Sequence, residues 1–252
     1  KRARIKKDFT FKETLQKDWK AYVILGGIGI FGTGAFAFCS YKYTTAMNAS
    51  ILGNTNALLI FLFSLFIGEK LTGSKIAGII LGMAGCYLII NNDLRFTLFD
   101  KKGLLGDFLA LGSAVCWALY TVVGKVSVRN SNSLHITTLN FLIGAVMFLI
   151  VILIFNLWQG DLKVGAVLWL LFLGIVPTAI GFLAWYKSLE YLESSITGIF
   201  QFLTVVLTTI LAYFFLEERF TVFFIAGMVL IFSGIYFPLF LINKSNFKKL
   251  LR

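Results

Sequence analysis

The sequence predicts an all-α, multi-pass membrane protein that contains inverted repeats. Three observations support this fold class. Hydrophobic residues make up 58% of the chain and charged residues 14%, and the mean hydropathy is +0.86; these values lie far outside the range of soluble globular domains. The chain also contains eight uncharged windows of membrane-spanning length, and part of its first half recurs in its second half.

The eight windows are expected to be transmembrane helices. A bilayer core about 30 Å thick needs roughly 20 helical residues at about 1.5 Å each. All twelve carboxylates lie in connections or at helix ends, as the cost of about 2.5 to 3.5 kcal/mol for a charge at a helix centre requires. The expected helices, first to eighth, are Ala21–Ser40, Ala49–Gly68, Ile76–Ile90, Phe108–Gly124, Leu139–Leu157, Ala166–Tyr186, Ser194–Leu216 and Val222–Leu241.

The basic residues predict the orientation of these helices in the cell membrane. Lys and Arg are retained on the cytoplasmic side. With the first segment inside, 17 of the 23 basic residues lie inside and 6 lie outside, so both termini are expected to be cytoplasmic. The net charge of +11 then matches anionic lipid headgroups as partners, and no nucleic-acid partner is expected.

An internal repeat relates the two halves of the chain. Phe66–Tyr87 aligns with Phe215–Tyr236 at a constant offset of 149, with nine of 22 positions identical and no gap. The second and third helices are therefore copies of the seventh and eighth, and the first corresponds to the sixth, where Gly32-Thr33 resembles Pro177-Thr178. The fourth and fifth have no counterparts, which predicts a parent protein of ten helices with two missing at the front.

The two units of this parent are expected to have opposite orientations in the membrane. Each unit would contain five helices, and an odd number places consecutive copies in opposite directions. Many secondary transporters have such inverted repeats, with the binding site near the midplane between them.

Four segments resemble the drug/metabolite transporter superfamily, and within it the EamA-like exporters. They are YKYTTAMNASIL from Tyr41, LFIGEKLTGSKIAGIILGMAGCYLI from Leu65, SAVCWALYTVVGK from Ser113 and FFLEERFTVFFIAGMVLIFSGIYF from Phe214. The resemblance covers nearly the whole chain and implies efflux of small metabolites or drugs by a permease that works by alternating access. Many members have a proline about thirteen residues before the turn glutamate, where this chain has Asn56 and Val205. The kink expected there is either absent or made differently.

The repeat and the resemblance together predict the organisation of the chain. A basic cytoplasmic loop, an extracytoplasmic connection and a basic cytoplasmic tail are expected around two EamA-like repeats, of which the first is incomplete, with three helices, and the second complete, with five. In chain order the segments are the loop 1–20, the first repeat 21–90, the connection 91–107, the second repeat 108–241 and the tail 242–252.

Polar and aromatic side chains inside the spans are the candidates for substrate binding, since no charge lies there. Trp117 lies well inside the fourth helix and shares one helical face with Tyr120 and Thr121. The second and seventh helices each carry a polar stripe. The alternative for each residue is packing, or interhelical hydrogen bonding worth about 0.6 kcal/mol on average. The expected substrate-binding residues are Asn54, Asn56, Trp117, Tyr120, Thr121, Gln201 and Thr204.

The turn acids Glu69 and Glu218 have two interpretations. Acids within a membrane often belong to proton relays. Here each is at a turn and is followed by a base, Lys70 or Arg219. An ion pair at headgroup level, or a cap for the third or eighth helix, is therefore the expected role.

Three classes of function remain open. A transporter of amino acids, related metabolites or drugs is preferred. A membrane-embedded enzyme would need converging reactive groups, whereas the chain has one histidine, His135, and no HExxH pattern; no metal or other cofactor is expected. A flippase or a nucleotide-sugar or phosphometabolite carrier would need cations for phosphate, for which Lys125 and Lys187 at helix ends are the only hints.

Overall fold

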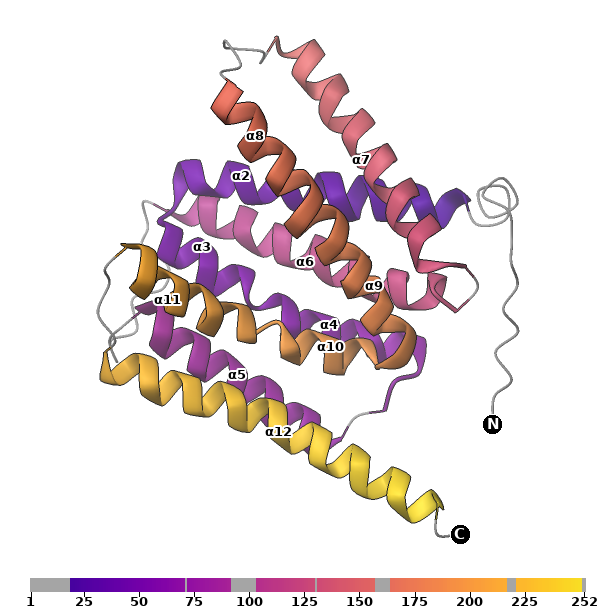
Figure 1. Cartoon of the computed structure of the whole chain (residues 1–252), viewed down its shortest axis with the longest axis vertical. Coiled ribbons are helices and arrows are strands. Elements are labelled where there is room, and N and C mark those ends of the chain that lie inside the picture. The colour runs from indigo at the N-terminus through magenta and orange to yellow at the C-terminus, as the bar shows by residue number, and fades with distance from the viewer. Residues whose placement is uncertain are drawn as a thin grey trace. The chain divides into compact units, whose positions relative to one another are not determined.

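The computed structural model describes residues 19–70, 72–91, 103–129, 131–156, 164–216 and 221–250, and every regular element within these ranges is a helix (Figure 1). Among these described residues, eight helical stretches are long and apolar enough to cross a membrane. The prediction of an all-α, multi-pass membrane protein is therefore confirmed. The stretches are Trp19–Tyr43, Ala46–Ile67, Gly73–Asn91, Leu104–Ser127, Ser133–Ile154, Val164–Tyr191, Ser194–Phe215 and Val222–Phe240.

The connections between the predicted repeats are only partly described. Residues 1–18 of the predicted loop, residues 92–102 of the predicted connection and the Glu218–Arg219 turn lie outside the described residues, whereas Trp19 and Lys20 already belong to the first helical stretch. Helix α6 (Leu104–Ser127) begins inside the predicted connection. Helix α12 (Val222–Leu250) continues through most of the predicted tail, so this part of the tail is helical.

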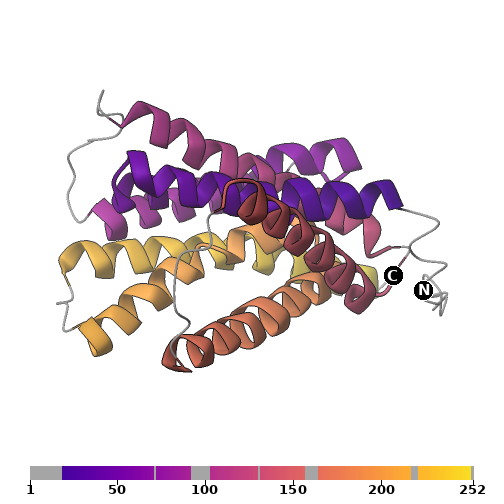
Figure 2. The ribbon, with the colours of Figure 1, turned by 90° about the horizontal axis from the view of Figure 1, so that it is seen from above.

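The first and sixth spans each contain a π-helical segment. In the first span η1 (Leu25–Gly32) precedes α2 (Thr33–Tyr43). In the sixth span η3 (Gly174–Ile180) lies between α8 (Val164–Leu173) and α9 (Gly181–Tyr191) and contains Pro177, which has no N–H to donate. Both spans run on as continuous helices through these segments (Figures 1 and 2). The two spans that the sequence equates thus share the same irregularity.

The second and seventh spans are each broken near their middle. The second consists of α3 (Ala46–Gly53), α4 (Asn56–Ser64) and the short η2 (Leu65–Ile67); the seventh consists of α10 (Ser194–Phe200) and α11 (Leu203–Leu216). Tightened hydrogen bonds close each break, from Thr55 N to Leu52 O at 3.1 Å and from Phe202 N to Ile199 O at 3.2 Å. Each helix is therefore interrupted near the predicted place without a proline, by tight turns.

The chain divides into two compact units that do not follow the sequence repeats. Unit 1 contains residues 1–34 and 119–192, and unit 2 contains residues 35–118 and 193–252. The boundary cuts the first span and α6. Each unit therefore includes segments from both halves of the sequence.

In unit 1, glycines let η1 approach its neighbours closely. Helix α7 (Ser133–Ile154) packs against η1. A Cβ atom added at Gly26 would lie 2.6 Å from Ile143 Cβ, and one at Gly29 would lie 2.2 Å from Tyr120 Cδ2. Side chains at these two positions would force the elements apart, because interiors are packed at crystal-like density.

Unit 1 also contains a buried aromatic cluster that is joined to α7 by a hydrogen bond. The rings of Tyr120 and Tyr186 lie edge to face, with centroids 5.4 Å apart. Asn140 Nδ2 donates a hydrogen bond to Tyr186 Oη at 2.9 Å, and all three residues are almost completely buried. This link ties α7 to α9.

Replacing Tyr186 with phenylalanine is expected to lower stability by about 1 kcal/mol, because the buried amide of Asn140 loses its acceptor. This corresponds to a melting temperature lower by roughly 2 to 4 °C for a chain of this size. The measurement is thermal unfolding of the detergent-solubilised protein. Tyr41→Phe removes the hydroxyl of an exposed tyrosine and serves as the control; an equal loss in both variants would contradict the role of the link.

In unit 2, α5 (Gly73–Asn91) and α12 run side by side along a row of glycines (Figure 1). A Cβ atom at Gly78 would lie 2.6 Å from Gly234 O, and one at Gly85 would lie 2.6 Å from Gly227 O. The reciprocal distances, from Gly227 to Gly85 O and from Gly234 to Gly78 O, are 2.6 and 2.7 Å. The offset of 149 equates Gly78 with Gly227 and Gly85 with Gly234, so the two contacts involve equivalent positions.

The main apolar core of unit 2 joins α4, α5, α10, α11 and α12. Phe202, at the break of the seventh span, lies where a Cβ atom at Gly82 would be 2.1 Å from its ring. The core therefore places the broken helices against the glycine-packed pair. Its buried members are Ala57, Phe61, Ile79, Cys86, Ile199, Phe202, Val205, Val206, Phe224, Ile231 and Ile235.

Candidate functional site

Two of the predicted substrate-binding residues form a polar pair in unit 2. Trp117 lies in the middle of α6, and Gln201 lies at the break between α10 and α11. Trp117 Nε1 donates a hydrogen bond to Gln201 Oε1 at 3.1 Å. Both side chains are only half-buried. A flat ring and a neutral amide with further donors thus lie together at membrane depth.

The other predicted residues of the polar stripes differ in how their groups are satisfied. Asn54 Nδ2 donates to Ser50 O at 2.8 Å, and Thr204 Oγ1 donates to Gln201 O at 2.7 Å. Both bonds stay within one helix or its break. Asn56 begins α4 and is 8% exposed, and its Oδ1 atom has no hydrogen-bond partner among the described residues. Of the four predicted residues in the two stripes, Asn54 and Thr204 bond to nearby backbone, whereas Gln201 bonds to Trp117 and Asn56 Oδ1 has no partner among the described residues.

Tyr120 and Thr121 follow Trp117 in α6 but belong to unit 1. Tyr120 is part of the buried cluster with Tyr186 described above. Thr121 is fully buried, and its Oγ1 atom has no hydrogen-bond partner among the described residues. Tyr120 thus contacts other aromatic side chains in unit 1, and its role in substrate binding stays a prediction.

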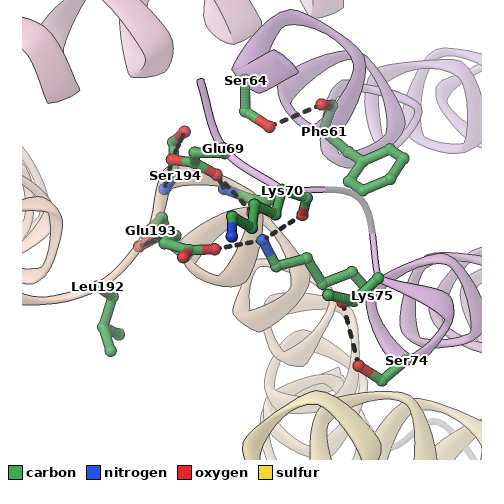
Figure 3. A network of polar contacts seen from close by, with 12 residues as sticks. Phe61, Ser64, Glu69, Lys70, Ser74, Lys75, Leu192, Glu193 and Ser194 are labelled. Atoms are coloured by element: carbon green, nitrogen blue, oxygen red, sulfur yellow. Dashed lines mark hydrogen bonds and ion pairs between the residues drawn. The ribbon is translucent and has the colours of Figure 1, made fainter. Parts of the chain in front are cut away.

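Glu69 makes contacts that the sequence interpretation did not include (Figure 3). Its Oε1 atom accepts from Ser194 N and Ser194 Oγ, both at 2.6 Å. Its Oε2 atom accepts from Ser195 N at 3.1 Å and from Ser195 Oγ at 2.5 Å. Glu69 therefore caps the N-terminus of α10 in the seventh span, whereas a headgroup ion pair or a cap for the following helix was expected.

Local backbone geometry positions the Glu69 carboxylate. Gly68 ends η2 in the left-handed conformation, with φ of 82°, which favours glycine over any residue with a side chain. The Glu69 N–H then donates to Ser64 O at 3.1 Å. The Gly-Glu pair of the turn thus has a structural reason, because the glycine turns the chain and the glutamate reaches α10.

The hydrogen bonds to Glu69 determine its ionisation. Burial of the carboxylate raises its pKa, but the bonds from Ser194 and Ser195 lower it by more, so that the net pKa is below the ordinary value. Glu69 is therefore ionised at neutral pH. Since its folded-state pKa is lowered, its contribution to stability is present above the ordinary carboxyl pKa and is lost as the pH falls through the lowered one.

A buried lysine adds a second link beside Glu69. Lys75, near the start of α5, is 4% exposed and forms an ion pair with Glu193, the residue before α10. Its Nζ atom also donates to Lys70 O at 3.0 Å. The turn after η2, the start of α5 and the start of α10 are thus joined by one polar network (Figure 3), which we call the Glu69 network.

The two lysines that hinted at phosphate binding have protein partners in unit 1. Lys125 Nζ donates to Leu189 O and to Leu192 O, each at 2.5 Å. Lys187 lies 3.3 Å from the Glu190 carboxylate. Lys125 thus satisfies carbonyls at the end of α9. Within the described residues no three His, Cys, Asp or Glu side chains gather as metal ligands.

A family model and individual relatives both relate this chain to transporters. The model of the EamA-like transporter family matches residues 5–91 and 104–240. An uncharacterized transporter of Archaeoglobus fulgidus is 30% identical over 87% of this chain and 75% of its own length. The uncharacterized transporter YyaM of Bacillus subtilis is 29% identical over 89% of this chain and 74% of its own length.

The fold agrees with this relationship. A solved crystal structure with 24% sequence identity superposes with a TM-score of 0.79, covering 92% of this chain and 80% of that chain. The family model matches two segments, and the gap between them, residues 92–103, falls within the predicted connection 91–107. The chain belongs to the EamA-like transporter family.

Proposed function

We propose that this membrane transporter exports small neutral metabolites, such as amino acids or related compounds, or drugs, and that it works by alternating access. The observation that carries the proposal is the Trp117–Gln201 pair beside the break of the seventh span. Broken helices in transporters place polar groups at the membrane midplane, where substrates bind. A neutral amide and an indole ring suit a substrate that has both polar and apolar parts.

The proposed site consists of the pair and its neighbours in the second and seventh spans. Trp117 would supply an apolar face, and Gln201 and Asn56 would supply amide donors and acceptors. Asn54 and Thr204 line the same breaks. Tyr120 and Thr121, the other two residues that the sequence selects, belong to unit 1 and stay sequence-based candidates.

The packing of α5 against α12 supports the inverted repeat in this mechanism. If two copies are related by a twofold axis in the membrane plane, equivalent helices meet in an antiparallel pair and each contact occurs twice. The contacts Gly78–Gly234 and Gly85–Gly227 have this reciprocity under the offset of 149. An exchange of the two copies is the symmetry that alternating access uses.

The orientation in the proposal comes from the sequence. Seventeen of the 23 basic residues lie on the side of the first segment, so both termini are proposed to be cytoplasmic. The Glu69 network would then lie at the cytoplasmic end of the spans. The protein contacts of Lys125 and Lys187 favour a neutral substrate over the alternative phosphate-bearing one.

The test of the function is uptake and counterflow of labelled neutral and aromatic amino acids by the complete protein in liposomes, with and without a pH gradient. We expect saturable counterflow of at least one of these solutes. Dependence on the gradient would indicate proton coupling. If folded protein moves none of the amino acids tested, and none of a panel of amphipathic drugs, the proposal is wrong.

A further inference from the structure

The two broken spans differ in how their first turns are capped. Helix α3 is capped by its own N-cap residue, Thr45, whose side chain accepts a hydrogen bond from Asn48 N at 3.1 Å. In α10 the N-cap residue Glu193 makes no such bond. The first amides of α10 instead depend on Glu69, which lies 125 residues away in the sequence. The N-terminal amides of a helix need acceptors, and here the acceptor belongs to another span.

The same end of these spans is closely packed. Helix α4 packs against α10, and a Cβ atom at Gly198 would lie 3.3 Å from Ile60 Cδ1. Under the repeat, α4 corresponds to α11 and α10 to α3. Within the described residues, no comparable packing joins α3 to α11. The two spans therefore meet at the Glu69 end and do not meet in the same way at their other end.

The lysine of the Glu69 network has no charged equivalent in the second copy. At the offset of 149 the position of Lys75 is taken by Phe224, which carries no charge. The Lys75–Glu193 pair can therefore form at only one end of the spans. Charge-assisted hydrogen bonds are about twice as strong as neutral ones, so the Lys75–Glu193 pair adds to the packing that holds the Glu69 end together.

From these three differences we propose that Glu69 is a detachable cap that holds the Glu69 ends of α4 and α10 together, and that this structure is the transporter conformer closed at that end. The inference rests on the proposed alternating access. Opening of this end withdraws the Glu69 carboxylate from Ser194 and Ser195, and water then accepts from the exposed amides and hydroxyls. The packing of α4 against α10 and the Lys75–Glu193 pair make the conformer that is closed at the Glu69 end the resting state.

Thiol labelling of the complete protein in liposomes tests this inference without any substrate. Cys39, Cys86 and Cys116 are first replaced, and one reporter cysteine is introduced. Ile60→Cys reports on the α4–α10 contact, because Ile60 is fully buried there. Thr208→Cys reports on the end of the spans that is remote from Glu69. Thr208 is exposed in α11 and lies seven residues after Gln201, so the two share one helical face. The reagent is a water-soluble maleimide present on both sides of the membrane.

The Glu69→Gln variant keeps the shape of the side chain but loses its charge. We expect labelling at Ile60→Cys to become faster by about tenfold, the factor equivalent to one weakened charged hydrogen bond, and labelling at Thr208→Cys to become slower. Ser195→Ala, which keeps the backbone bond, is expected to shift both rates in the same directions by less. It also replaces Glu69→Gln should that variant fail to fold.

Thr45→Ala is the matched control, because it removes a cap that lies within a single helix. It is expected to lower the melting temperature and to leave both labelling rates unchanged. Unchanged labelling at Ile60→Cys in folded Glu69→Gln protein would overturn the inference. Faster labelling there without slower labelling at Thr208→Cys would overturn it too, since it would show local fraying of α10. A coupled change in a protein that moves no solute would support the cap and contradict the transport function.

Discussion

Replacing Trp117 with alanine is expected to lower counterflow of the transported solute at least about tenfold, because the site loses a ring face and Gln201 loses its donor. A half-buried amide oxygen without its partner also costs free energy when the substrate cannot replace the bond. The measurement is initial counterflow in liposomes, normalised to the amount of folded protein. Trp117→Phe keeps an aromatic face and is expected to retain more activity than the alanine variant.

The control for this prediction is Trp169→Ala in α8. Trp169 is 69% exposed on a span with an apolar surface, so its removal is expected to change counterflow by less than about twofold. Gln201→Leu tests the other member of the pair and should resemble Trp117→Phe. If Trp117→Ala and Trp169→Ala transport equally well, the pair is a packing contact and the site lies elsewhere.

Substitution of Gly85 by alanine is expected to destabilise the protein by about 1 to 3 kcal/mol, the usual cost of overpacking. The new Cβ atom would lie 2.6 Å from Gly227 O and 2.7 Å from Ile231 Cγ1, so α5 and α12 must separate. The expected fall in melting temperature is roughly 3 to 10 °C. Because the contact is reciprocal, Gly227→Ala is expected to cost a similar amount.

The matched control is the same substitution at the start of the same helix. A Cβ atom at Gly73 would meet nothing within 4 Å. Gly73→Ala is therefore expected to leave stability unchanged or to raise it slightly, as alanine favours helix over glycine by up to about 1 kcal/mol. Thermal unfolding in detergent compares the three variants. Equal melting temperatures for Gly85→Ala and Gly73→Ala would show that α5 and α12 do not depend on close glycine packing.

The breaks in the second and seventh spans could be predicted only in part from the local sequence. The absence of proline at Asn56 and Val205 left open whether the second and seventh spans bend at all. Both spans break, but through tightened turns at Thr55 and Phe202. Asn54 and Thr204 beside the breaks donate to backbone carbonyls of the preceding turn. Such side chains compete with the helix for backbone groups, which is a weaker signal of irregularity than proline.

The candidate site was predictable in part. Trp117 and Gln201 were selected for their polarity or ring at membrane depth, and the structure brings these two together. Tyr120 was selected for the same reasons and lies in the buried cluster of unit 1. Tyr120 is three residues after Trp117, about 60° around the helix axis, and helical spacing alone does not show which neighbours each side chain meets.

The sequence by itself determined the eight spans, the repeat and the family. These features depend on local properties, because a bilayer requires length and apolarity of each segment separately. Only the tertiary structure decided that Glu69 caps α10 and that Trp117 meets Gln201. These contacts join residues 125 and 84 positions apart. They depend on the rotation and axial register of packed helices, and hydropathy along a single chain does not encode either.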